Sequence, residues 1–128
     1  MSYYNSTNFD GTFEEAIQKT TEELKKQGFG ILTEINVKDT FKKKLDIDFK
    51  KYMILGACNP NFAHQAISAE DKIGTMLPCN VIVEEHEDGR VEVTAVDPLA
   101  SMQSVENDEL TPIATQVRDS LKTVIDNI

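Results

Sequence analysis

Two alternating segments on either side of residues 87–89 constrain the fold of this chain more than any other feature. Apolar residues recur at every second position in both segments, at Val81, Val83, Val91, Val93 and Ala95. This period predicts two half-buried β-strands joined in a hairpin, and Gly89 can adopt the positive φ that a three-residue loop needs. A slip of one residue would turn every apolar side chain to the opposite face, so the register is fixed. It sets Val83 opposite Val93, Val81 opposite Ala95 and Cys79 opposite Asp97.

Residue patterns outside the hairpin predict three more strands and four helices. β-Branched and aromatic residues mark the strands, and apolar residues at helical spacing mark the helices. The first long helix opens with a capping box, in which the Thr12 hydroxyl accepts from the Glu15 amide and the Glu15 carboxylate reaches back. The expected elements are a strand at 2–9, a helix from 13 to Gly28, a strand at 29–37, a short basic helix at 38–45, a strand ending at Cys58, a helix from Pro60 to about Asp71, and a C-terminal helix that starts at Thr111-Pro112.

This order of elements predicts an α+β fold. We expect two layers, in which a largely antiparallel five-stranded sheet has helices packed on one face in the order β-α-β(4)-α. A chain of 128 residues is long enough to bury a sizeable core, so we expect a single domain over residues 1–128.

The charge balance narrows the classes of partner. Thirteen Lys and Arg residues against 22 Asp and Glu residues give a net charge of −9. This charge opposes nonspecific nucleic-acid binding and attraction to an anionic membrane, so we expect neither as a partner. No apolar run approaches the ~20 residues of a membrane span, and the N-terminus lacks the basic and apolar regions of a signal peptide. We therefore expect a cytoplasmic protein whose two cysteines are thiols.

Two Cys-Asn pairs stand where strands meet loops, and they define the candidate site. Cys58-Asn59 ends the third strand, and Cys79-Asn80 begins the fourth. If these strands are antiparallel neighbours, both pairs lie at one edge of the sheet, and residues from the following helix and from the end of the fifth strand can join them. The candidate ligand-binding residues are therefore Cys58, Asn59, His64, Cys79, Asn80 and Asp97.

These residues have plainer interpretations as well. Cysteine packs in cores as a small apolar residue, Asn59 can cap the helix that begins at Pro60, and Asp97 can end a strand. Chemically, the cysteines could instead cycle between dithiol and disulfide, or bind a metal ion with His64 or Asp97. A C-x20-C spacing is not a zinc signature, and the sequence has no Gly-rich phosphate loop. The sequence therefore identifies no catalytic residue, metal or cofactor.

The second face of the predicted hairpin is neither fully polar nor a complete core. It carries Asn80, Ile82, Glu84, Glu92, Thr94 and Val96. If no helix covers this face, its apolar part needs a partner or a ligand. A homodimer is the simplest expectation.

Four short motifs carry a resemblance to a known family. LGACNP, LPCNVIV, GFGILTEI and AVDP together resemble the family known as domain of unknown function 302, over about residues 28–102. The resemblance implies a fold like that of the TATA-binding-protein class, often dimeric, but it carries no inference of DNA binding. It implies no established activity. The family's motif positions here are Gly56, Cys58, Asn59, Pro60, Pro78, Cys79, Asn80 and Asp97.

The functional expectation is accordingly broad. We expect a homodimer that binds a small molecule or an ion at the edge defined by Cys58 and Cys79. Two alternatives stay open: a thiol-redox or sulfur-handling enzyme that uses the same two cysteines, and a non-catalytic interaction module.

Overall fold

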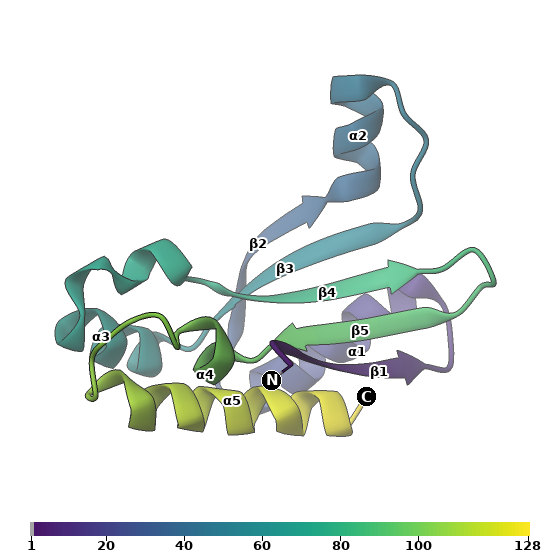
Figure 1. Ribbon diagram of the computed structural model, residues 1–128. Coiled ribbons are helices and arrows are strands. Elements are labelled where there is room, and N and C mark those ends of the chain that lie inside the picture. The colour runs from purple at the N-terminus through teal and green to yellow at the C-terminus, as the bar shows by residue number, and fades with distance from the viewer. Residues whose placement is uncertain (1) are drawn as a thin grey trace.

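The computed structural model describes residues 2–128 and places five strands and two long helices in the order β-α-β(4)-α, with shorter helices inserted between strands (Figure 1). This is the α+β arrangement that the sequence predicts. The elements are β1 (Tyr4–Phe9), α1 (Phe13–Lys26), β2 (Gly30–Asn36), α2 (Val37–Leu45), β3 (Tyr52–Cys58), α3 (Pro60–Ala69), the 3₁₀ helix η1 (Asp71–Met76), β4 (Cys79–Glu85), β5 (Val91–Val96), α4 (Pro98–Ser101) and α5 (Leu110–Asp126).

The five strands form one antiparallel sheet in the order β1-β5-β4-β3-β2. The hairpin register is the predicted one, with Val81 opposite Ala95 and Val83 opposite Val93. The ladder between β4 and β5 ends at Val81 and Ala95, so the pair Cys79 and Asp97, which would continue the predicted register, lies beyond its last pair. The Asp97 side chain caps the next helix, while its backbone amide still donates to the Tyr3 carbonyl beside β1.

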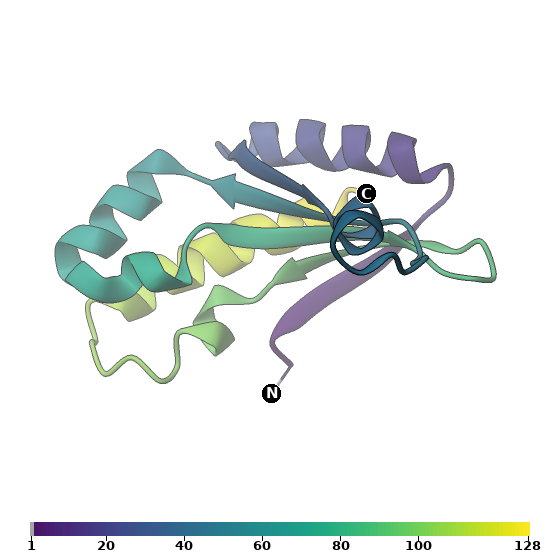
Figure 2. The ribbon, with the colours of Figure 1, turned by 90° about the horizontal axis from the view of Figure 1, so that it is seen from above.

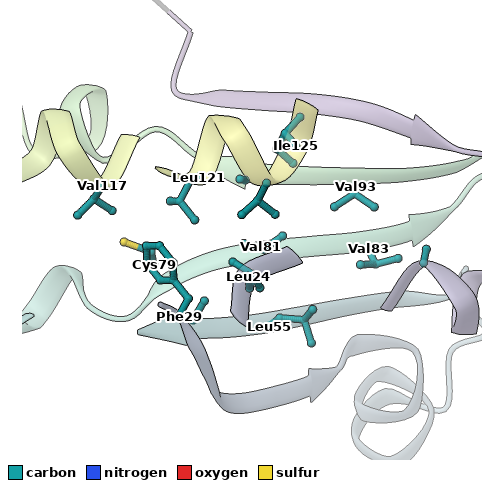
Figure 3. Close-up of a cluster of buried hydrophobic side chains, with 14 of the residues drawn as sticks. Leu24, Phe29, Leu55, Cys79, Val81, Val83, Val93, Val117, Leu121 and Ile125 are labelled. Carbon is teal, nitrogen blue, oxygen red and sulfur yellow. The ribbon is translucent and has the colours of Figure 1, made fainter. Parts of the chain in front are cut away.

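The helices α1 and α5 cover one face of the sheet, which we call the covered face (Figure 1). Valines from β4 and β5 meet Leu24 of α1 and Leu121 of α5 there, and all of these side chains are buried (Figure 3). The expected capping box starts α1: the Thr12 hydroxyl accepts from the Glu15 amide at 3.1 Å, and the Glu15 carboxylate accepts from the Thr12 amide at 3.0 Å. The alternating residues of the hairpin therefore form the centre of the core.

Within residues 2–128, no helix covers the other face, which we call the open face. The short basic helix α2 rises from the sheet on that side, opposite to α1 and α5 (Figure 1), and it is seen almost end-on from above (Figure 2). None of the residues of α2 is buried. Its capping residue is Asn36, whose side chain accepts from the Asp39 amide at 3.0 Å.

The C-terminal helix begins earlier than predicted. Its first residue is Leu110, and Glu109 before it makes no side-chain cap, so the predicted start at Thr111-Pro112 was wrong. Leu110 is buried in a second apolar cluster with Ala66 and Ile73, and this burial extends the helix. Proline is tolerated in the first turn because amides there have no partner within the helix. No helix that the structure describes is long and apolar enough to cross a membrane.

Candidate functional site

A small apolar cavity lies at the end of the sheet where β3 finishes and β4 begins. The helices α3 and α5 and the short helix α4 close it. Its volume is about 40 Å³, which is room for a few atoms, since a single water occupies roughly 10–15 Å³ by this measure. No charged side chain lines it. The lining residues are Phe29, Ala57, Cys58, Asn59, Phe62, Ala63, Ala66, Leu77, Pro78, Cys79, Pro98, Met102, Leu110, Ile113, Ala114 and Val117.

Both cysteines line this cavity. Cys79 lies opposite Ala57 on the neighbouring strand, and Cys58 follows Ala57 and pairs with Gly30 on its other side. The two thiols are therefore at the same end of adjacent strands, but they are not direct cross-strand partners. Neither forms a disulfide; Cys79 is buried and Cys58 is half-buried. Figure 3 shows Cys79 pointing from β4 into the layer between the sheet and α5.

The surroundings of Cys79 keep its thiol protonated. Burial raises the pKa of Cys79 from about 9 to about 11, and the neighbouring Cys58 adds to the rise because two thiolates would repel. At neutral pH, roughly one molecule in 10⁴ would then carry a thiolate at Cys79. The cavity therefore presents a neutral S–H group, which is a weak hydrogen-bond donor and an apolar contact.

Asn59 holds the wall of the cavity in place through both ends of its amide. Its side-chain oxygen accepts from the amides of Asn61 at 3.1 Å and Phe62 at 3.4 Å, and so caps α3. Its side-chain nitrogen donates to the carbonyl of Gln27 at 3.4 Å, where α1 ends. A Cβ atom on Gly28 would come within 2.9 Å of the same nitrogen, so the turn after α1 and the start of α3 fit closely.

The other three candidate residues do not line the cavity. Asn80 follows Cys79 in the same strand, so its side chain points to the open face, where it is exposed. His64 is exposed on α3. Asp97 is half-buried at the N-cap of α4, where it accepts from the amides of Leu99 at 3.0 Å and Ala100 at 3.3 Å.

One motif position, Gly56, is explained by the lack of space for a side chain. Gly56 is buried in β3, and a Cβ atom there would collide with the hydroxyl of Thr33 on β2. The same Cβ would come within 2.8 Å of the Pro78 ring. A side chain at position 56 would therefore displace Thr33 on β2 and Pro78, which directly precedes Cys79.

A charged cluster on the open face is the feature that the site prediction missed. Glu84 and Glu92 are directly opposite in the β4–β5 ladder. Lys50 binds Glu84 at 2.7 Å, and the His86 ring nitrogen lies 2.9 Å from a Glu92 oxygen. The predicted register already contained the signal, because two opposed carboxylates need a cation between them. Ligand atoms of Glu84, His86 and Glu92 lie within 4.8 Å of one another, a spacing that a metal ion tolerates, but Lys50 already supplies a positive charge to Glu84.

The same face is hollowed beside this cluster. A groove of about 430 Å³ crosses four strands, from β1 to β3. Its lining mixes aromatic, apolar and polar side chains, unlike the cavity on the covered side. These residues are Tyr3, Tyr4, Ser6, Tyr52, Asn80, Ile82, Glu84, Glu92, Thr94 and Val96.

Comparisons with known proteins agree on the family. No curated protein matches the chain. Among solved structures, the chain is similar to "Crystal structure of uncharacterized conserved protein DUF302 from Bacillus stearothermophilus". The TM-score is 0.92 and the sequence identity is 24%, over 99% of this chain and 98% of that chain, which shows a shared fold. The model of the family "Domain of unknown function DUF302" matches residues 5–128, and the chain therefore belongs to that family.

Proposed function

We propose that this protein is a homodimer that binds a small uncharged molecule, or the apolar end of a larger one, in the cavity between Cys58 and Cys79. One observation carries the proposal: two free thiols from separate motifs line one apolar cavity that has no charged side chain in its wall. Apolar cavities stay free of water and take up apolar guests. The free thiols also support a cytoplasmic location, where thiols stay reduced.

The chemistry of the lining selects against charged ligands. A carboxylate or phosphate placed here would lose its hydration and find no cation among the lining residues. A soft metal ion would have to displace the proton of a thiol, and burial makes that proton harder to remove from Cys79. A neutral guest meets no such penalty, so uncharged apolar molecules are the class we propose.

The volume sets the size of the first probe. A cavity of about 150 Å³ is needed to hold benzene, so a cavity of about 40 Å³ accepts a benzene-sized ligand only after α3 or the Met102 side chain moves outward. Xenon, a single polarizable atom, is the probe that requires the least movement. We expect pressurised xenon to shift the methyl NMR signals of the lining alanines Ala57, Ala63, Ala66 and Ala114.

A filled variant gives the control. Ala114→Leu places three more carbon atoms at the cavity wall, and we expect it to abolish the xenon-dependent shifts. Ala100→Leu makes the same change at a half-buried position outside the lining and should leave them intact. Xenon shifts that are equally strong in Ala114→Leu would place the guest elsewhere and refute the cavity. Native mass spectrometry of freshly purified protein reports subunit number and any bound mass; a monomer would refute the homodimer.

A second candidate is thiol-redox chemistry, which is favoured by the presence of two free thiols around one cavity. It requires that Cys58 and Cys79 lose two protons and two electrons to an external disulfide oxidant and form an S–S bond. Oxidation by oxidised glutathione followed by mass spectrometry tests it, because the internal disulfide is two mass units lighter. If the native protein keeps both thiols under these conditions, only the binding role survives.

A further inference from the structure

The segment over residues 37–51, which we call the arm, stands away from the body of the molecule (Figure 1). It comprises α2 and the connection to β3. The helix buries none of its residues, and two apolar side chains near its tip are largely exposed: Leu45 at 61% and Ile47 at 49%. A short helix that buries nothing gains little stability from packing within its own chain.

Contacts within the arm hold α2 against the connection to β3, and one aromatic contact joins the arm to the sheet. The rings of Phe41 and Phe49 pack edge to face, with their centroids 5.0 Å apart. The ring of Phe49 also packs at a tilt on that of Tyr52, with the centroids 6.4 Å apart. The Lys38 ammonium donates to the Phe49 carbonyl at 2.7 Å. Tyr52 in turn lines the groove on the open face, so the aromatic contacts join the arm to that groove. The arm is thus a projection beside the groove.

Charge distinguishes the arm from the rest of the chain. It holds six lysines and three aspartates, a net charge of +3, whereas the rest of the chain has a net charge of −12. Two of these lysines, Lys50 and Lys51, pair with glutamates of the body, so the unpaired positive charge lies on α2. Lys43 and Lys44 make no ion pair within residues 2–128. A surface that complements the arm is therefore acidic, and the body of a second copy of this chain has that character.

The register places the arm and an exposed aromatic corner at opposite ends of one diagonal of the sheet. The arm follows the end of β2, at the hairpin end of the edge formed by β2 and β3. Tyr4 begins β1 and Tyr3 directly precedes it. They lie on the edge formed by β1, at the end of the sheet away from the hairpin loop, beside Val96. Tyr3 is 66% exposed and Tyr4 44%. The groove runs over the strands between these two corners.

This diagonal arrangement suits a two-fold axis. Consider a two-fold axis that lies over the open face, parallel to the sheet, and runs along the other diagonal. Rotation about this axis places the arm of a second copy above the Tyr3–Tyr4 corner of the first copy. The same rotation brings the first arm to the second corner, so the contact is made twice with one set of residues. The strands of the two open faces then cross at a steep angle, which is one of the two usual ways for sheets to pack.

We propose that the homodimer forms through the open faces, with the arm of each copy packed against the Tyr3–Tyr4 corner of the other. The inference rests on the proposed homodimer and assigns its surface. Leu45 and Ile47 supply apolar contact, Lys43 and Lys44 face the acidic body of the partner, and the groove is closed between the two copies.

Cysteine cross-linking tests the arrangement directly. Leu45→Cys protein and isotopically labelled Tyr3→Cys protein are mixed and mildly oxidised, and the products are identified by mass. We expect the mixed disulfide between the two variants to exceed either self-linked product at least about tenfold. Ile67→Cys, at an exposed position of α3 outside the arm, is the matched control and should give no mixed product with Tyr3→Cys.

Dissociation measured by analytical ultracentrifugation gives the second readout. Leu45→Asp should raise the dimer Kd at least about 10-fold, whereas Ile67→Asp should leave it unchanged. A wild-type monomer would overturn both this inference and the proposed homodimer. A dimer that resists Leu45→Asp and forms no mixed disulfide would overturn this inference alone. Binding of the arm to anionic lipid vesicles by a monomeric protein, lost in Lys43→Glu, would assign the arm to membranes instead.

Discussion

The two faces of the sheet are built from the same strands and differ in almost every other respect. On the covered face, valines and leucines pack against α1 and α5, and the cavity between Cys58 and Cys79 has an uncharged wall. On the open face, Glu84, His86 and Glu92 form a charged cluster beside a wide groove. The covered face excludes water and keeps a thiol neutral, while the open face presents charge, aromatic rings and a basic arm.

The family's own motif is divided between these faces. In the pair Cys79-Asn80, alternation along β4 turns the cysteine toward the cavity and the asparagine toward the groove. The pair therefore cannot serve one small site as a unit. Under the two proposals above, the cysteine would serve the guest molecule and the asparagine would serve the partner.

The largest expected difference between the faces is in packing. Leu55 points to the covered face and is fully buried, and its neighbour Ile54 points to the open face and is half-buried. We expect Leu55→Ala to lower the free energy of unfolding by about 3 kcal/mol and Ile54→Ala by about 1 kcal/mol, because only the first leaves a closed cavity. Urea unfolding measures both. Equal losses would mean that the open face is packed as tightly as the covered one.

Alkaline pH should affect the covered face through Cys79. Its folded pKa of about 11 lies above the ordinary value of about 9, so the unfolded chain loses the proton first as pH rises. The stability that the neutral thiol contributes is fully present below pH 9 and is lost as pH approaches 11, a fall of about 2–3 kcal/mol. Unfolding curves across this range should show the fall in Cys58→Ala protein and lack it in Cys79→Ala protein. A fall of equal size in Cys79→Ala would assign it to other groups.

The charged cluster should depend on Lys50, at the base of the arm, more than the tip of the arm depends on the ion pairs of Lys42. Lys50→Met leaves the Glu84 carboxylate, whose side chain is 11% exposed, without its cation, and should cost about 2 kcal/mol. Lys42→Met removes exposed pairs with Asp46 and Asp48 and should cost less than about 0.5 kcal/mol. Thermal unfolding at one protein concentration compares the two. A negligible cost for Lys50→Met would show that Glu84 is solvated in the native protein.

The smallest expected effect concerns a buried polar residue of α1. Thr20 of α1 is fully buried, and its hydroxyl has no hydrogen-bond partner among residues 2–128. Thr20→Val keeps the shape and removes the unsatisfied group, so it should raise the free energy of unfolding by about 1 kcal/mol. Thr123→Val, at an exposed position of α5, is the control and should change little. A loss of stability in Thr20→Val would indicate that the hydroxyl has a partner in solution.

The parts of the fold that depend on local patterns could be predicted from the sequence. Alternating valines set the hairpin register, and the Thr12–Glu15 capping box set the start of α1. Each of these signals is formed by residues that are close together in the sequence. The meeting of Cys58 and Cys79 at one end of the sheet also follows from strand order. These features need no knowledge of distant contacts.

The remaining features depend on contacts between distant segments. The cavity is closed by Met102, Leu110 and Val117, whose positions are set by how α4 and α5 pack on the sheet. Asp97 was expected in the site, but two backbone amides of α4 take its carboxylate. His64 faces solvent, because the apolar stripe of α3 faces the body and leaves that position outside.

The side chain of Asn59 explains why an asparagine stands at this point of the motif. Serine, threonine and aspartate can all cap a helix by accepting from its first amides. None of them can at the same time donate an amide N–H to the Gln27 carbonyl, as Asn59 does at 3.4 Å. An aspartate here would set a negative oxygen against that carbonyl. Only a carboxamide side chain can make both contacts between the end of α1 and the start of α3. A displacement of one of these helix ends therefore moves the other.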